Sequence, residues 1–166
     1  MRKLVLIALV VFFVLTSPLF AQQKKGDSEL QLQGSLTIGM SNDFPDFGLV
    51  NVRFGRFLTD RQEVGGTLLG VFSGDGDIGG MGGPFWRFNF TTNSKTVPYV
   101  GAAVQGGFGD FYSDSDVLAT LEGGVRWFLQ RNMAFTVGAQ MDYDVDESEF
   151  VDYLGVLFGF SYFWEK

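Results

Sequence analysis

The chain of 166 residues suits a single domain and carries 19 acidic against 12 basic side chains, for a formal net charge of −7. An acidic balance argues against nucleic-acid binding, which normally depends on a basic patch. Because the sequence has no His and no Cys, it also excludes Ser-His and Cys-His nucleophilic catalysis and zinc sites built from those ligands.

Residues 1–21 have the layout of a secretory signal peptide. A short basic start precedes an apolar run over residues 4–15, and a small residue, Ala21, closes the segment. The apolar run is shorter than the ~20 residues that a helix needs to cross a bilayer. We therefore expect cleavage after Ala21, export, and one domain over residues 22–166.

After this segment, apolar and polar residues alternate with a period of two, which is typical of β-strands. In the first such segment Leu30 and Leu32 alternate with Gln31. Each segment has one apolar and one polar face. Eight segments in chain order show the pattern: residues 30–40, 50–55, 63–72, 84–90, 97–108, 119–127, 135–143 and 154–164.

The connections between these segments alternate in length. Three are brief, "TDRQ", "TTNSK" and "QRN", whereas the others are longer and richer in Gly or acid: "SNDFPDF", "SGDGDIGGMGGP", "DFYSDSD" and "DYDVDESEFVD". Short turns at one end (the turn end) and long loops at the other (the loop end) are typical of outer-membrane barrels. We predict an all-β protein, an eight-stranded antiparallel up-and-down transmembrane β-barrel. The last strand pairs with the first, because every backbone group in lipid needs a partner.

Period-two parity does not by itself say which face lies inside. The polar face carries glycines at positions 101, 107, 124, 138, 155 and 159. The interior of an eight-stranded barrel is only just wide enough for side chains, so small inward residues would leave room for larger polar ones. We therefore place the polar face inside. A soluble ligand-binding barrel remains the alternative if the apolar face is inside.

Aromatic residues gather near both strand ends and predict the two interfacial girdles of a membrane barrel. Ordinary core aromatics are the alternative interpretation. The expected turn-end girdle comprises Phe57, Phe90, Tyr99, Trp127, Phe128, Phe135, Tyr162, Phe163 and Trp164. The expected loop-end girdle comprises Phe44, Phe47, Phe72, Phe85, Trp86, Phe108, Phe111, Tyr112, Tyr143, Phe150 and Tyr153.

Several charged residues share the inward parity, and buried charges must be paired. We predict a salt-bridged polar network that blocks free diffusion, in a barrel too narrow for a general porin. Its members are Arg53, Glu63, Arg87, Glu122 and Arg126.

The four long connections, strand ends included, hold 13 of the 19 acids and no Lys or Arg, which predicts a negative outer rim. The acidic loop residues include Asp75, Asp77, Asp114, Asp116, Asp144, Asp146, Glu147 and Glu149. No dedicated metal site is expected, because "MDYDVDESEFVDY" lacks the Gly and final Glu of an EF-hand and "SGDGDIGGMGG" is a single copy that is interpreted as a loop. We hypothesise that weakly bound divalent cations bridge these acids to anionic lipopolysaccharide.

Two stretches carry a family resemblance. "EGGVRWFLQRNMAFTVGAQMDYD" resembles the strand–turn–strand unit of the outer membrane protein β-barrel domain family, the small OmpA/OmpX-type barrels. "YLGVLFGFSYFWEK" is similar to the C-terminal strand that such proteins present to the outer-membrane assembly machinery, with alternate Phe158, Phe160, Tyr162 and Trp164. The resemblance implies an outer-membrane location in contact with lipid and lipopolysaccharide. Because nothing follows Lys166, we expect no peptidoglycan-binding domain.

We predict a non-enzymatic role without a cofactor. We also expect the barrel to be monomeric. Known barrel enzymes of this size resemble one another in relying on a histidine, which this chain lacks. Loop acids such as Asp43, Asp46, Asp75 and Asp77 could do acid–base work, but charge runs are usually solvated. We expect a structural or surface-interaction role in the cell envelope. The alternative is a narrow channel or carrier for small or hydrophobic solutes.

Overall fold

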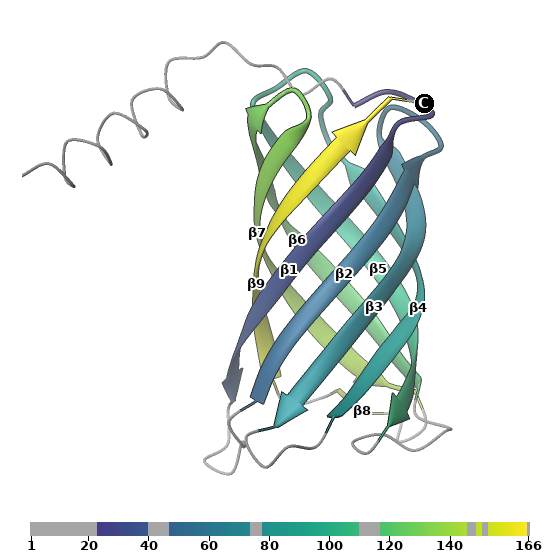
Figure 1. Ribbon diagram of the computed structural model, residues 1–166, viewed down its shortest axis with the longest axis vertical. Coiled ribbons are helices and arrows are strands. Elements are labelled where there is room, and N and C mark those ends of the chain that lie inside the picture. The colour runs from purple at the N-terminus through teal and green to yellow at the C-terminus, as the bar shows by residue number, and fades with distance from the viewer. Residues whose placement is uncertain are drawn as a thin grey trace, which may run out of the picture.

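The computed structural model describes residues 23–39, 47–73, 78–109, 117–145, 149–150 and 153–165. Within these ranges, eight long antiparallel strands form a closed barrel (Figure 1). The predicted eight-stranded barrel is therefore confirmed. Its strands are β1 (Ser28–Gly39), β2 (Phe47–Phe57), β3 (Gln62–Ser73), β4 (Ile78–Asn89), β5 (Thr96–Gly109), β6 (Val117–Gln130), β7 (Met133–Asp144) and β9 (Tyr153–Trp164).

Closure of the ring rests on β9, which pairs with both β7 and β1. The β1–β9 register runs from Ser28 opposite Trp164 to Gly39 opposite Tyr153. None of the eight described long strands is left as an open edge, which would expose unpaired backbone groups. A short ninth strand, β8 (Glu149–Phe150), pairs with the loop end of β7.

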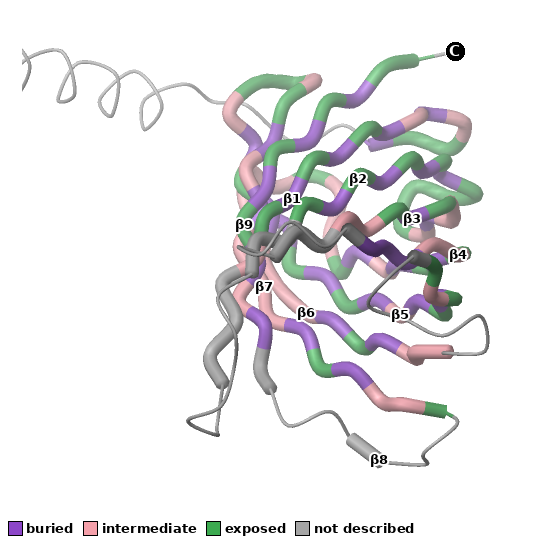
Figure 2. The backbone as a smooth tube through the Cα atoms, turned by 60° about the horizontal axis from the view of Figure 1, so that its bottom comes forward, coloured by how far each residue is buried: buried purple, intermediate pink, exposed green. Residues whose placement is uncertain are grey.

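The barrel wall is apolar outside and polar inside. Figure 2 shows buried and exposed residues alternating along the strands. In β1, Leu30 and Leu32 expose 46% and 56% of their surface, whereas Gln31 between them exposes none. The polar face therefore lies inside the barrel, as we predicted from the glycines on that face. Exposed apolar surface of this extent needs apolar surroundings.

In the described part of the chain, no helix has the length and hydropathy needed to cross a membrane. Residues 1–21, predicted as a signal peptide, lie outside the described residues.

The fourth strand begins earlier than predicted. The stretch from Ser73 to Pro84 was interpreted as a loop, but Ser73 belongs to β3 and β4 already begins at Ile78. Gly79, Gly80, Gly82 and Gly83 pair with β3, and residues 74–77 lie outside the described residues. Glycine has no side chain, so a glycine-rich strand shows no alternation of apolar and polar residues in its sequence. Pro84 has no N–H group to donate, and the β4–β5 pairing is interrupted at Gly83 and Pro84.

The predicted turn-end girdle is only partly correct. Phe57, Tyr99, Phe128 and Phe163 expose 5% or less and face the interior. Their positions have the parity of the inward polar columns, and parity decides the face because consecutive strand residues point to opposite sides. The other residues predicted for this girdle face outward. Outward rings also contact one another, as in the Tyr162–Trp164 and Trp86–Phe88 pairs.

At the loop end, Phe85 was also wrongly assigned, because it is 5% exposed and faces the interior. Phe85 and Trp86 both lie in the second half of β4, nearer the turn end. Phe108 faces outward with 48% exposure. Of the residues predicted for the loop-end girdle, the following have side chains that the structure does not describe: Phe44, Phe47, Phe72, Phe111, Tyr112, Phe150 and Tyr153.

The outward face makes a direct prediction about lipid contact. Leu68, near the middle of β3, exposes 54% of its surface. We expect Leu68→Arg to reduce the free energy of unfolding in lipid vesicles by about 2–4 kcal/mol, the usual cost of a cation at the bilayer midplane. Urea titration followed by tryptophan fluorescence measures it.

The matched control for this experiment is Leu58→Arg, just beyond the turn end of β2, where Leu58 is similarly exposed. A cation near the interface costs about 0–1 kcal/mol. Equal effects of the two substitutions would contradict a lipid-facing wall.

Candidate functional site: an ionic network inside the barrel

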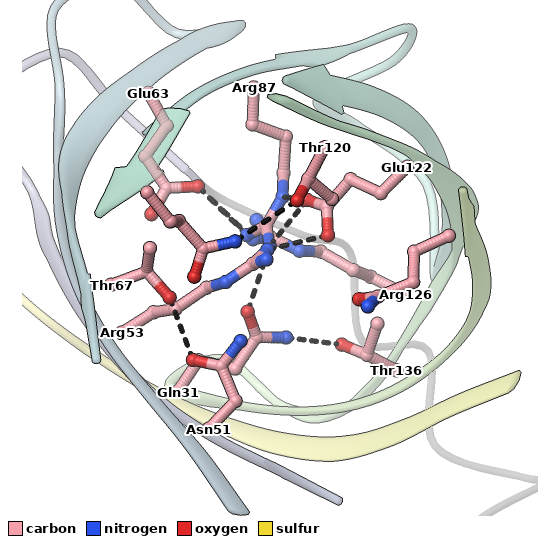
Figure 3. Close-up of polar contacts among 12 residues, drawn as sticks. Gln31, Asn51, Arg53, Glu63, Thr67, Arg87, Thr120, Glu122, Arg126 and Thr136 are labelled. Carbon is pink, nitrogen blue, oxygen red and sulfur yellow. Dashed lines mark hydrogen bonds and ion pairs between the residues drawn. The ribbon is translucent and has the colours of Figure 1, made fainter. Parts of the chain in front are cut away.

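Six buried charged side chains cross the barrel interior. They project inward from five strands, and Figure 3 shows the guanidinium groups meeting near the barrel axis. None exposes more than 7% of its surface. This set, called the ionic network below, consists of Glu29 (β1), Arg53 (β2), Glu63 (β3), Arg87 (β4), and Glu122 and Arg126 (both β6).

Glu122 forms the first centre of the ionic network. Arg53 Nη1 donates to Glu122 Oε2 at 2.6 Å. Arg87 Nε and Nη2 donate to Glu122 Oε1 at 3.2 and 3.1 Å. Both carboxylate oxygens therefore accept charge-assisted hydrogen bonds, which are stronger than neutral ones.

Glu63 and Glu29 form the second centre. Glu63 Oε2 accepts hydrogen bonds from Arg87 Nη1 at 3.2 Å and Arg126 Nη2 at 3.1 Å. Arg126 Nη2 also lies 2.8 Å from Glu29 Oε2, and Glu29 Oε1 lies 3.7 Å from Arg87 Nη1. Arg87 thus contacts all three carboxylates and links the two centres. Three cations face three anions, so the charge within the ionic network is balanced.

Aromatic rings and an amide complete the surroundings of the guanidinium groups. Arg87 Cζ lies 4.7 Å from the Tyr99 ring centroid and 5.5 Å from that of Phe85. Arg126 Cζ lies 5.6 Å from the Tyr99 ring. Such contacts within about 6 Å are attractive because the ring face is negative. Gln31 Oε1 accepts a further hydrogen bond from Arg87 Nη2 at 2.9 Å.

Inward glycines make room for this network. A Cβ atom at Gly55 would collide with the Glu63 carboxylate. At Gly101 it would lie 2.8 Å from Glu122 Oε1. At Gly124 and Gly138 it would lie 2.9 and 2.8 Å from the Tyr99 hydroxyl. The narrow interior therefore accepts its large polar side chains only because the facing positions are small.

A layer of hydrogen-bonded polar groups, which includes Asp142, lies between the ionic network and the loop end. Gln105 Nε2 donates to Thr120 Oγ1 at 3.0 Å, and Thr120 Oγ1 donates to Asp142 Oδ1 at 2.5 Å. Gln140 Nε2 donates to Asp142 Oδ2 at 3.2 Å. A cavity of about 10 Å³ lies nearby, with Gln33 and Gln140 in its lining. This volume suits about one water molecule.

The structure brings the five charged residues proposed from the sequence, Arg53, Glu63, Arg87, Glu122 and Arg126, into one contact network. Sequence reasoning missed Glu29, because the first strand was predicted to begin at Leu30. Its odd position continues the Gln31 column, which could have revealed it. Tyr99 was missed because its place near a strand end was weighed above its parity.

The predicted acidic loop residues are mostly not described. Asp144 ends β7 and Glu149 begins β8, and their backbones pair. Among the described residues, no group of three or more acidic side chains is placed to hold a metal ion. Outside the described residues lie Asp75, Asp77, Asp114, Asp116, Asp146 and Glu147.

The residues expected to guide assembly form one outward row on β9. Phe158, Phe160, Tyr162 and Trp164 expose between 36% and 56% of their surface. The Phe160 ring packs 5.1 Å from Phe135 on β7.

No protein-family model matches the chain, and no curated protein matches it in sequence. Solved structures match its fold. The N-terminal β-barrel domain of Pseudomonas aeruginosa OprF is 17% identical with a TM-score of 0.69, covering 86% of this chain and 100% of that domain. Neisserial surface protein A is 13% identical with a TM-score of 0.58, covering 82% of this chain and 95% of its own.

The outer membrane protein OprG from Pseudomonas aeruginosa is likewise 13% identical, with a TM-score of 0.56, covering 87% of this chain and 99% of its own. At these identities the likeness concerns the fold alone. The chain therefore has the fold of small outer-membrane β-barrels, as its resemblance in sequence predicted.

The charge balance of the ionic network leads to a stability prediction. Arg87→Met would leave three buried carboxylates facing two cations, and we expect a loss of about 3–5 kcal/mol in the free energy of unfolding. Urea unfolding in lipid vesicles measures it. Joint replacement of Arg53 by Met and Glu122 by Leu keeps the charges balanced and should cost less. The reverse order of stability would show that charge pairing is not what the network supplies.

Proposed function

We propose that the protein is a non-enzymatic β-barrel of the outer membrane with a structural or surface-interaction role in the cell envelope. The outward apolar wall supports a bilayer location, since exposed apolar surface is stable only in apolar surroundings. The shared fold with an outer membrane protein supports the same membrane. Fold alone does not specify an activity, so the role is argued from the barrel's interior and rim.

The interior supports a plugged barrel rather than a pore. The observation that carries this proposal is that every member of the ionic network exposes 7% of its surface or less. A continuous water path would leave exposed area on the side chains that line it. The carboxylates are also held by Arg87 and its neighbours, so they do not face a space where a substrate could bind.

With the interior occupied, the surfaces that remain for partners are the lipid-facing wall and the two rims. We propose contacts with outer-membrane lipid and lipopolysaccharide, assembly through the outward row on β9, and a monomeric barrel. Residues 1–21 would direct export and then be cleaved, which leaves one domain over residues 22–166.

Planar-bilayer conductance tests the plugged barrel. We expect the refolded full chain to give no large, stable open-channel currents, because ions cannot cross a layer of paired buried charges without breaking it. Migration in a gel before and after heating serves as the folding control. Large and stable currents from folded protein would overturn the plug and favour the narrow channel or carrier.

Calcium titration tests the proposed cation bridging at the loop end. Of the 19 acids, 13 lie in the long connections and the strand ends that flank them, so divalent cations should relieve their repulsion and raise the thermal unfolding temperature. Sodium chloride at equal ionic strength is the control for simple screening. The bridging proposal fails if calcium has no effect beyond that of sodium.

A further inference from the structure

The barrel interior also contains a buried apolar cluster, none of whose members belongs to the ionic network. At the turn end, five apolar side chains meet inside the wall. They come from the ends of five strands, so the layer spans most of the ring. This set, called the apolar cap below, consists of Phe57 (β2), Val97 (β5), Phe128 (β6), Ala134 (β7) and Phe163 (β9).

Phe163 is the centre of the apolar cap. Its ring is stacked on Phe128 with the centroids 5.2 Å apart, and it lies 6.3 Å from the ring of Phe57. Val97, Phe128 and Ala134 have no exposed surface. A water path lined by these three side chains would leave exposed area on them.

Backbone hydrogen bonds fasten each large ring of the cap to a neighbouring segment at the turn end. Phe57 N donates to Asp27 O at 2.9 Å. Phe128 N donates to Lys95 O, and Phe163 N donates to Asn132 O, both at 2.8 Å. These bonds hold the cap residues at the rim, next to the ionic network, because Phe163 is opposite Glu29 and Phe57 is opposite Glu63 on neighbouring strands.

The two layers oppose ions by different physical means. The ionic network holds fixed charges that an ion would have to displace. The side chains of the apolar cap carry no polar group to bind an ion, and a hydrophobic constriction stops conduction by excluding water. Arg126 marks their boundary, because its Cζ lies 5.7 Å from the Phe163 ring.

We propose that the barrel is closed by two barriers in series and that the apolar cap alone stops ions when the ionic network is opened. The inference rests on the proposed plugged role and adds the residues of a second seal. If the short turns face the periplasm, as in other outer-membrane barrels, the cap closes the periplasmic mouth.

Conductance of four variants of the full chain tests this proposal. The network variant carries Arg53→Ala with Glu122→Ala, which opens space while keeping the charges balanced. The cap variant carries Phe128→Ala with Phe163→Ala, and the combined variant carries all four. Phe90→Ala is the control, because Phe90 is an outward aromatic near the turn end. We expect stable currents from the combined variant only.

The outcomes separate the two proposals. Currents from the network variant equal to those from the combined variant would overturn the apolar cap as a barrier while leaving the plugged role intact. Currents from the unaltered chain would overturn the plugged role itself. A folded combined variant without currents would also overturn the inference, because a further barrier would then have to exist.

A single substitution provides a second test that does not depend on the combined variant folding. The chain has no Cys, so Ala134→Cys places one thiol in the cap and Arg131→Cys places one on the exposed turn beside it. In the network variant, a charged thiol reagent should modify position 134 on the order of 100-fold more slowly than position 131, since a buried group reacts only through local opening. Equal rates would overturn the proposal.

Discussion

Pairing between β1 and β9 is the interaction on which the rest of the structure depends. In hydrocarbon an unpaired backbone N–H or C=O costs several kcal/mol, so a sheet that crosses a bilayer has to close on itself. Closure with eight strands leaves an interior only as wide as its side chains. That width explains why Gly101 faces Glu122 and why Gly124 and Gly138 face Tyr99.

The narrow interior also determines how its charges behave. Carboxylates and guanidinium groups that cannot be hydrated have to be paired, and Arg87 forms ion pairs with three carboxylates. Apolar filling of the same volume could be equally stable. Polar inward residues have a separate consequence, because a strand with one apolar and one polar face resists slipping by one residue. The ionic network therefore supports the register as well as occupying the interior.

Much of the fold and part of the site could be predicted from the alternation of residues. Arg53 and Arg126 were assigned to the interior by parity, and they are buried there. Glu29 was missed because strand boundaries are poorly marked in sequence. Phe163 was assigned to the outer girdle because its place near a strand end outweighed its parity. The start of β4 was missed because glycines carry no alternating side chains to detect.

The sequence by itself determined the number of long strands and which side chains share a face, because a pleated strand points successive residues to opposite sides. Only the tertiary structure decided which of the inward charges meet. Glu29 and Arg126 are on strands that do not pair, as are Arg87 and Glu122. They come together because the closed sheet curves around a narrow axis, and a residue pattern of period two contains no information on that curvature.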